Sequence, residues 1–410
     1  MLRIPMAGTL AALLLASAPA AAQDPAAAPS DTTESLEEIE SRLLGELGER
    51  DTTPGRAPAA GAVASSLNPD ISLIADFLVD LSLEEATLEE GDRFQLREIE
   101  LGIQGAVDPY FRYDAFLGLH GGEIEIEEAY ATTLGLPAGL QVRLGKFLLP
   151  FGKVNLTHRP ELQMFDYPLA IQEYFGEEGF SSTGVQASVI GRPLGFYQEI
   201  SLVAANGAEA HAHGEEEEHA ALVPSQEDDE HDEEEHGESL FDDLADRLWV
   251  AHLRNSVDLT EAANLELGAS WGTSVGEEEE EHVRTNLYGV DATWRWKPPA
   301  RAKYRSALLQ AEVVWRNEVD GELGTRTGAF LYGQWQLSRR WYAGARLDRV
   351  ELPEEDGTLR GGQLLLKVFP TEFSQLRLAY ERRDPEGGEA VDRVILQTTF
   401  ALGPHRPHAY

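Results

Sequence analysis

The residues of this chain best suited to chemistry are histidines in a long acidic segment, residues 208–246. Imidazole and carboxylate groups together suit Zn²⁺, Ni²⁺ or Cu²⁺, and a His-x-His pair is a common local chelating unit. The segment contains no Lys or Arg, so its negative potential would concentrate cations. The candidate metal ligands, with zinc foremost, are His211, His213, His219, His231 and His236.

Two interpretations of this segment stay open. Its spacing matches no structural zinc motif, and its composition is also typical of a solvated, disordered acidic loop. Weak capture of several metal ions is compatible with disorder. A shorter tract, Glu277–Glu281 with His282, repeats the same composition. We expect no required cofactor, with Zn²⁺ or another divalent metal as the ligand of the long loop.

A second segment, residues 150–180, mixes charged and apolar side chains. A solvated loop has no need of Phe165, Ile171 or Phe175, so we expect packing inside a pore or against another subunit. Selective pores narrow with charged groups, which favours a constriction loop over an inert cap. Two further basic residues, Arg112 and Arg143, occupy inward-facing strand positions. The candidate pore-lining residues are therefore Arg112, Arg143, Lys153, His158 and Arg159.

No catalytic motif competes with these segments. The chain contains 0 Cys, which removes thiolate chemistry and disulfides. Its net charge of −39 argues against nucleic acid as a partner and favours cations. We therefore expect no enzymatic activity.

The elements that carry these segments follow from alternation of apolar and polar residues. From about Asp70 onward the chain runs as segments of roughly ten residues with period two, divided by turn residues. This pattern predicts an all-β fold, a transmembrane antiparallel β-barrel of about 16 strands with a short N-terminal periplasmic helix. The strands are expected near 70–82, 92–105, 110–120, 123–134, 140–149, 181–191, 196–206, 248–258, 264–275, 283–297, 304–317, 326–337, 341–351, 359–369, 374–384 and 391–402.

The lengths of the connections support this count. Links after even-numbered strands are short and rich in Pro or Gly, as periplasmic turns are. Links after odd-numbered strands are long and acidic, except Gly121-Gly122, and are expected at 83–91, 150–179, 206–246, 276–282, 318–324 and 352–358. The parity predicts an outer-membrane barrel of a Gram-negative bacterium, with both termini periplasmic. A soluble β-sandwich would not give this asymmetry.

The remaining segments frame the barrel, expected at 67–403. Residues 1–22 carry a basic start, a short apolar run and an A-x-A site, which predicts a cleaved signal peptide. Residues 23–66 are of low complexity and include a predicted helix at 35–48, either a frayed periplasmic helix or a short coiled coil between copies. In the tail, 404–410, Tyr410 is a candidate assembly signal, as is Phe400 in the last strand.

Two stretches resemble the phosphate-selective porin (O and P) family. One is residues 94–105 with Arg112-Tyr113-Asp114, and the other runs from Val142 to Gly152 and contains Gly-Lys-Phe and Pro-Phe-Gly. The resemblance implies a 16-stranded, typically trimeric outer-membrane channel with inward-folded loops. The family's anion selectivity rests on ladders of Lys and Arg, whereas this chain has 33 basic against 72 acidic residues. The resemblance therefore does not imply that phosphate is the substrate of this chain.

These features predict a porin-like channel for small hydrophilic solutes or ions, with a cation-attracting external loop. The alternative is a metal-binding outer-membrane receptor for zinc or another divalent metal. An energy-coupled receptor would need about 22 strands and a plug domain, and the segment before Asp70 is too small for one. The expected partners are outer-membrane lipid, small solutes or ions, and further copies of the chain.

Overall fold

The structure is a computed structural model, and its described residues form a barrel with its connecting loops. The described residues are 69–83, 87–88, 91–120, 123–206, 247–278, 281–319, 324–353 and 355–403. The chain divides into two units, Met1–Ala59 and Ala60–Tyr410, and all described residues belong to the second. The predicted signal peptide, the helix at 35–48, the His-rich loop at 208–246 and the tail at 404–410 lie outside the described residues.

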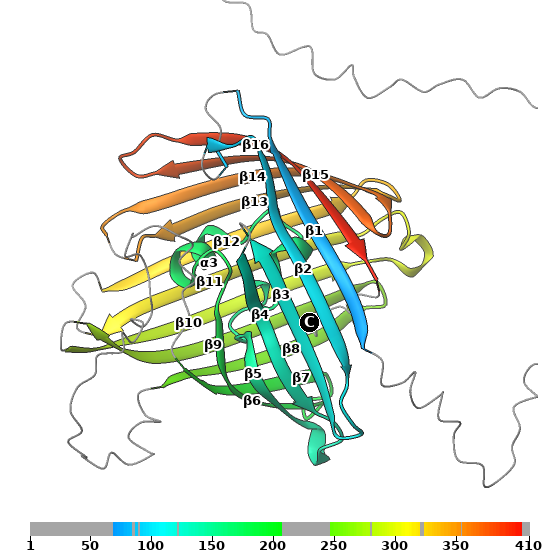
Figure 1. Ribbon diagram of the computed structural model, residues 1–410, viewed down its shortest axis with the longest axis vertical. Helices are drawn as coiled ribbons and strands as arrows, with labels where there is room; N and C mark the ends of the chain where they lie inside the picture. Colours follow the sequence, from blue (N-terminus) through cyan, green and yellow to red (C-terminus); the bar gives the residue numbers. More distant parts are fainter. Residues whose placement is uncertain are drawn as a thin grey trace, which may run out of the picture. The chain divides into compact units, whose positions relative to one another are not determined.

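Sixteen antiparallel strands close into one barrel, each paired with its neighbours in sequence and β1 paired with β16 (Figure 1). The predicted fold class and strand number are thereby confirmed. The strands are β1 Asp70–Asp80, β2 Phe94–Ala106, β3 Phe111–His120, β4 Glu123–Thr133, β5 Leu140–Leu148, β6 Ser181–Gly191, β7 Tyr197–Ala205, β8 Leu248–Thr260, β9 Ala263–Glu278, β10 Glu281–Trp296, β11 Ala307–Val319, β12 Thr325–Gln336, β13 Trp341–Glu351, β14 Thr358–Thr371, β15 Ser374–Pro385 and β16 Val391–Leu402.

Helical structure in the described residues is confined to short pieces. One α-helix, α3, spans Leu169–Phe175, within the segment that joins β5 to β6. Four 3₁₀ turns are η2 Pro137–Gly139, η3 Val154–Leu156, η4 Arg159–Glu161 and η5 Pro299–Arg301. No described helix has the length and apolar character needed to cross a membrane.

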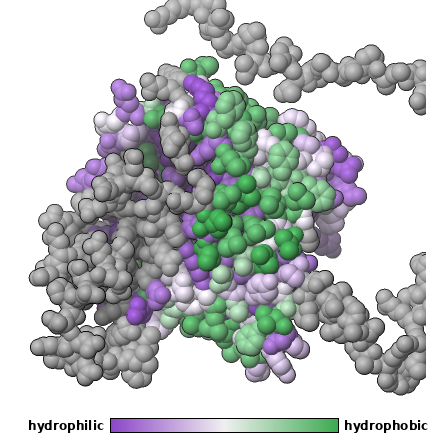
Figure 2. All heavy atoms as spheres, in the orientation of Figure 1, coloured by the Kyte–Doolittle hydropathy of each residue, from purple (hydrophilic) through white to green (hydrophobic). Residues whose placement is uncertain are grey.

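The alternation read from the sequence sorts side chains between the two faces of the barrel wall. In β15, Arg377 and Glu381 are buried inside, whereas Leu378 and Tyr380 are exposed outside. Successive side chains of a strand point to opposite faces, so one strand supplies both surfaces. On the outer face Figure 2 shows a continuous hydrophobic area over β1 to β3. The exposed apolar side chains of these strands include Phe77 and Leu96.

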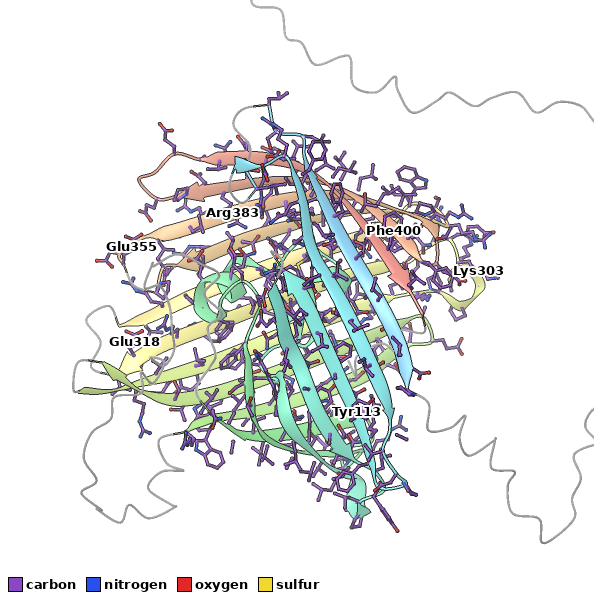
Figure 3. All side chains as sticks on the ribbon, viewed as in Figure 1. Tyr113, Lys303, Glu318, Glu355, Arg383 and Phe400 are labelled. Carbon is purple, nitrogen blue, oxygen red and sulfur yellow. The ribbon has the colours of Figure 1, made fainter. Side chains whose placement is uncertain are left out.

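The two ends of the barrel differ in their connections. Short turns join even-numbered strands to the next strand, and most of the longer connections lie at the opposite end. Glu318 and Glu355 lie at this second end and Lys303 at the first (Figure 3). One expected long link, 276–282, is wrong: β9 continues to Glu278 and β10 begins at Glu281. The paired ladder continues outward because acidic side chains do not by themselves end a strand.

Candidate functional site

The segment between β5 and β6, residues 149–180, folds into the barrel and is named here the inner loop. Most of the described hydrophobic core is made of its apolar side chains together with apolar residues of the inner wall. Phe151 and Phe180 pack on Phe175, with ring centroids 5.3 and 4.6 Å away. A packed apolar core is not expected of a solvated loop, so the inner loop is a fixed part of the lumen.

The Pro-Phe-Gly sequence fixes where the inner loop turns inward. The backbone N–H groups of Lys153 and Val154 donate to Glu312 Oε1 of β11 at 2.9 and 2.8 Å. Gly152 has φ +66° in the left-handed region, and a Cβ there would lie 2.5 Å from Glu312 Oε2. Only glycine allows both that conformation and that approach. The motif is therefore a device that attaches the loop to the opposite wall.

Basic side chains of the far wall hold the backbone of the inner loop. Arg346 Nη1 donates to the carbonyl oxygen of Asp166 at 2.6 Å, and Arg377 Nη2 donates to that of Leu162 at 2.7 Å. Lys367 Nζ donates to the carbonyl oxygen of Gln163. These basic residues lie on neighbouring strands, β13 to β15, and are almost completely buried. The sequence shows no basic run along one strand, so this row, assembled across strands, was missed.

Glycines of the inner wall make room for helix α3. A Cβ on Gly328 of β12 would lie 2.6 Å from Ala170 Cβ, and one on Gly361 of β14 would lie 2.7 Å from Leu169 Cδ1. The helix is further fixed by Asp348, whose Oδ1 accepts the backbone N–H of Leu169 at 3.1 Å. Close approach of loop and wall therefore depends on missing side chains, a signal that alternation alone does not reveal.

Two β-bulges turn extra charged side chains into the lumen. Asp76 of β1 pairs with Glu98 and Phe77 with Leu96, so Arg97 is the extra residue and both Arg97 and Glu98 are buried. In β4 the partner of Phe116 is Glu128 and that of Leu117 is Ile126, which leaves Glu127 as the extra residue. A bulge re-aims side chains in this way.

His158 lies against the carboxylates that the second bulge supplies. Its Nδ1 is 2.7 Å from Glu127 Oε2 and 3.0 Å from Glu100 Oε2, and its Nε2 is 2.9 Å from Glu128 Oε2. Burial alone would lower the pKa of His158, but the carboxylates, Glu100 foremost, outweigh it and place this pKa well above the usual value. The imidazolium therefore ties the inner loop to β2 and β4.

The five predicted pore-lining residues do not meet at one ring. Arg112 pairs with Asp114, and Arg143 lies over the ring of Tyr130 at 4.2 Å. Lys153 donates to Glu266, and Arg159 Nε lies 3.6 Å from Asp166 Oδ1. With His158, these side chains are distributed over different parts of the lumen. Their contribution to ion selectivity stays a prediction.

A cavity remains beside the inner loop. It measures about 130 Å³ and lies between the loop and the wall formed by β4 to β8. Arg143 and Arg254 line it from the wall, opposed by Glu128 and Glu199. His252, which the sequence analysis did not select, also lines it and is 2.9 Å from Ser270 Oγ. Both signs of charge therefore border the space left open in the lumen.

Comparisons with known proteins agree on the fold. No family model matches the chain. An uncharacterized protein of Aquifex aeolicus (strain VF5) is 28% identical over 408 residues, which cover 83% of this chain and 80% of that protein. The identity is too low to assign the chain to a family.

Solved structures similar to the barrel are outer-membrane proteins. OprB of Pseudomonas putida matches with a TM-score of 0.53 and 9% identity, covering 83% of this chain and 96% of its own. The trimer form of Vibrio cholerae OmpT and the anion-selective porin of Comamonas acidovorans each match with a TM-score of 0.51, at 9% and 8% identity. Each covers 82% of this chain and 99% of the matched one. At this identity the likeness shows a porin-like barrel fold. This likeness does not show membership of the phosphate-selective porin family.

Proposed function

We propose that the chain is a non-enzymatic outer-membrane channel for small hydrophilic solutes or ions. The observation that carries this proposal is a closed 16-stranded barrel with apolar side chains outside and, inside, a cavity of about 130 Å³ beside the inner loop. Barrels of this strand number enclose an aqueous channel when loops do not fill them. The porin folds of the similar structures support it.

A swelling assay tests this proposal. Liposomes that contain the purified protein should swell in isotonic arabinose and much more slowly in stachyose, because a narrowed lumen admits the small sugar preferentially. Liposomes without protein are the control. Absence of swelling in arabinose would contradict a diffusion channel.

We further propose that the end bearing the inner loop and residues 208–246 faces the outside of the cell. The support is the parity of the connections, with the ends of β1 and β16 at the opposite, periplasmic end. A protease added to intact cells should then cut within 208–246. Cleavage there only after the periplasm is opened would contradict this orientation. A homo-oligomer, a trimer by resemblance to porins, is the expected assembly.

Lys153 should make ion selectivity depend on pH. Burial and, to a smaller extent, Arg254 lower the pKa of Lys153 to about 8. The side chain therefore loses its positive charge between pH 7 and 9, and the preference for cations should rise over that interval. The reversal potential under a KCl gradient measures this. Lys153→Gln should abolish the step, whereas Lys303→Gln, at the exposed opposite end, should keep it. A step that survives in Lys153→Gln would contradict the assignment.

The external loop should bind zinc weakly, with several ions per chain. Its support is the sequence alone: histidines within a segment that carries no positive charge. Because neutral imidazole is the ligand, binding should weaken as pH falls through about 6.5. Calorimetric titration of Zn²⁺ should show loss of these sites when all five histidines are changed to Asn. Equal Zn²⁺ binding by the wild type and by the five-histidine variant would mean that the loop is only an acidic surface. The alternative function, a metal-binding receptor, depends on this loop and has no structural support.

A further inference from the structure

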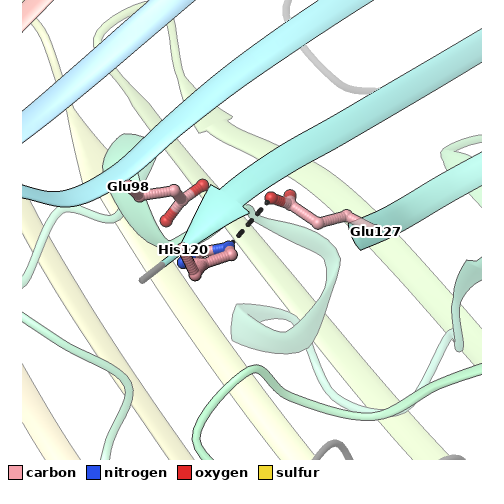
Figure 4. Close-up of side chains that lie close together, drawn as sticks. All are labelled: Glu98, His120 and Glu127. Atoms are coloured by element: carbon pink, nitrogen blue, oxygen red, sulfur yellow. Dashed lines mark ion pairs between the residues drawn. The ribbon is translucent and has the colours of Figure 1, made fainter. Parts of the chain in front are cut away.

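A triad of side chains lies on three adjacent strands. Glu98 of β2, His120 of β3 and Glu127 of β4 converge in the lumen, and Figure 4 shows both carboxylates beside the imidazole. One nitrogen or oxygen atom from each residue lies within 4.8 Å of the other two. The triad is independent of residues 208–246 and does not rest on the proposed channel function.

The orientation of His120 leaves Nε2 available to a cation at the triad. Its Nδ1 lies 3.2 Å from the carbonyl oxygen of Arg97, which can only accept a hydrogen bond. Nδ1 therefore carries a hydrogen, and Nε2 faces carboxylate oxygens, Glu127 Oε1 at 3.6 Å and Glu178 Oε1 at 3.8 Å. The protonated ring donates to these oxygens through Nε2, whereas the neutral ring offers the Nε2 lone pair to a metal ion between them. Metal-bound histidines are oriented by the same hydrogen bond from the second ring nitrogen.

Glu98 points to a ligand independently of this orientation. It is 2% exposed and, among the residues that the structure describes, forms no hydrogen bond or ion pair. An ionised carboxylate buried without a partner is strongly unfavourable, so Glu98 needs a cation or a proton. The nearby Arg97 already binds Asp76 through Nε at 2.8 Å, and Arg159 Nη2 donates to the carbonyl oxygen of Glu177 at 2.6 Å.

The local backbone leaves space for the cation. Gly118 lies two residues before His120 on the inner face of β3, and a Cβ there would overlap Glu127 Oε1 and lie 2.5 Å from His120 Nε2. A cavity of about 30 Å³ is lined by the triad and by Glu178 of the inner loop. This space is large enough for an ion with a water molecule.

We propose that Glu98, His120 and Glu127 bind one divalent transition-metal ion inside the barrel, with Zn²⁺ as the metal that suits one imidazole and two carboxylates. Glu178 lies within reach as a further ligand from the inner loop. A bound ion would then connect the loop to the β2–β4 wall, beside the contact that His158 already makes.

Calorimetry with Zn²⁺ tests this site on the full mature chain in detergent. The starting protein carries His→Asn changes at all five positions in 208–246 and at His282, His405 and His408, so that binding by these histidines is removed, and it is stripped with EDTA. It should bind one Zn²⁺ per chain. His120→Asn and Glu98→Gln should each weaken that binding at least about tenfold, as loss of a metal ligand does.

Matched controls separate the triad from general effects. Gly118→Ala should also abolish the site without removing a ligand, whereas Gly362→Ala, with nothing within 4 Å of its added Cβ, should not. His252→Asn changes a buried lumen histidine outside the triad and should bind normally. Heat-modifiable migration on gels checks that each barrel is folded. If His120→Asn does not fold, the zinc binding of Gly118→Ala tests the site in its place. No binding to the starting protein, or equal binding by all folded variants, would overturn the proposal.

Discussion

Replacing residues 157–177 with a short Gly-Ser linker is expected to raise single-channel conductance by roughly a factor of three or more, because conduction follows the width of the constriction. This segment contains helix α3 and most of the core residues that the inner loop contributes. The attachment of Lys153 and Val154 to Glu312 is left in place, so the entry turn is retained. Planar-bilayer recordings at fixed salt measure the effect.

A control for this replacement is available at the other end of the barrel. Substituting residues 299–304, between β10 and β11, with a linker of the same length should leave the conductance unchanged, since this segment lies outside the lumen packing. An unchanged conductance after removal of the inner-loop segment would show that the loop does not limit the flow of ions.

His158→Ala is expected to release the inner loop from the wall, with a cost on the order of 3–5 kcal/mol, as for removal of one partner of a buried ion pair. The substitution leaves the carboxylates of Glu100, Glu127 and Glu128 facing one another without the imidazolium. Movement of the loop relieves this repulsion more readily than unfolding of the barrel. Limited proteolysis within 157–177, in EDTA so that no metal compensates, should become much faster.

His252→Ala is the matched comparison for that change. His252 is also buried in the lumen, but its contact is with the hydroxyl of Ser270 at 2.9 Å rather than with carboxylates. Its removal should leave the inner loop resistant to protease. Equal sensitivity of the two variants would mean that charge pairing at His158 does not hold the loop.

The strands could be predicted because their signal is local. Alternation at Arg377 and Leu378, for example, already separates the inner from the outer face, and the connections supported the number of strands that alternation predicted. The boundary between β9 and β10 could not be read, because the register of two paired strands rather than charge sets how far they extend.

The candidate sites depend on how neighbouring strands pair, and most of them could therefore not be predicted from the sequence. Glu98 and Glu127 enter the lumen because bulges occur at or beside them, and a bulge changes the phase that alternation assumes. Alternation along β3 places His120 on the inner face, yet nothing in its own strand shows which carboxylates it meets. The row formed by Arg346, Lys367 and Arg377 likewise exists only across strands.

The inner loop was the part of the site most accessible from sequence. Its mixture of apolar and charged residues predicted packing inside the barrel or against another subunit, and the structure places the loop inside the barrel. The predicted set Lys153, His158 and Arg159 was expected to border the pore, whereas each is paired with a carboxylate. Charge alone does not distinguish a residue that faces the solute from one that fixes the loop.

The central claim is that this barrel is an open, ion-conducting channel, and a planar lipid bilayer tests it most directly. Purified wild-type protein added to one side should give discrete conductance steps in 1 M KCl. Under a KCl gradient its reversal potential should indicate a preference for cations, given the excess of acidic residues in the chain. Folded protein that inserts into the bilayer without conductance steps would contradict the channel, and a reversal potential of opposite sign would contradict the cation preference.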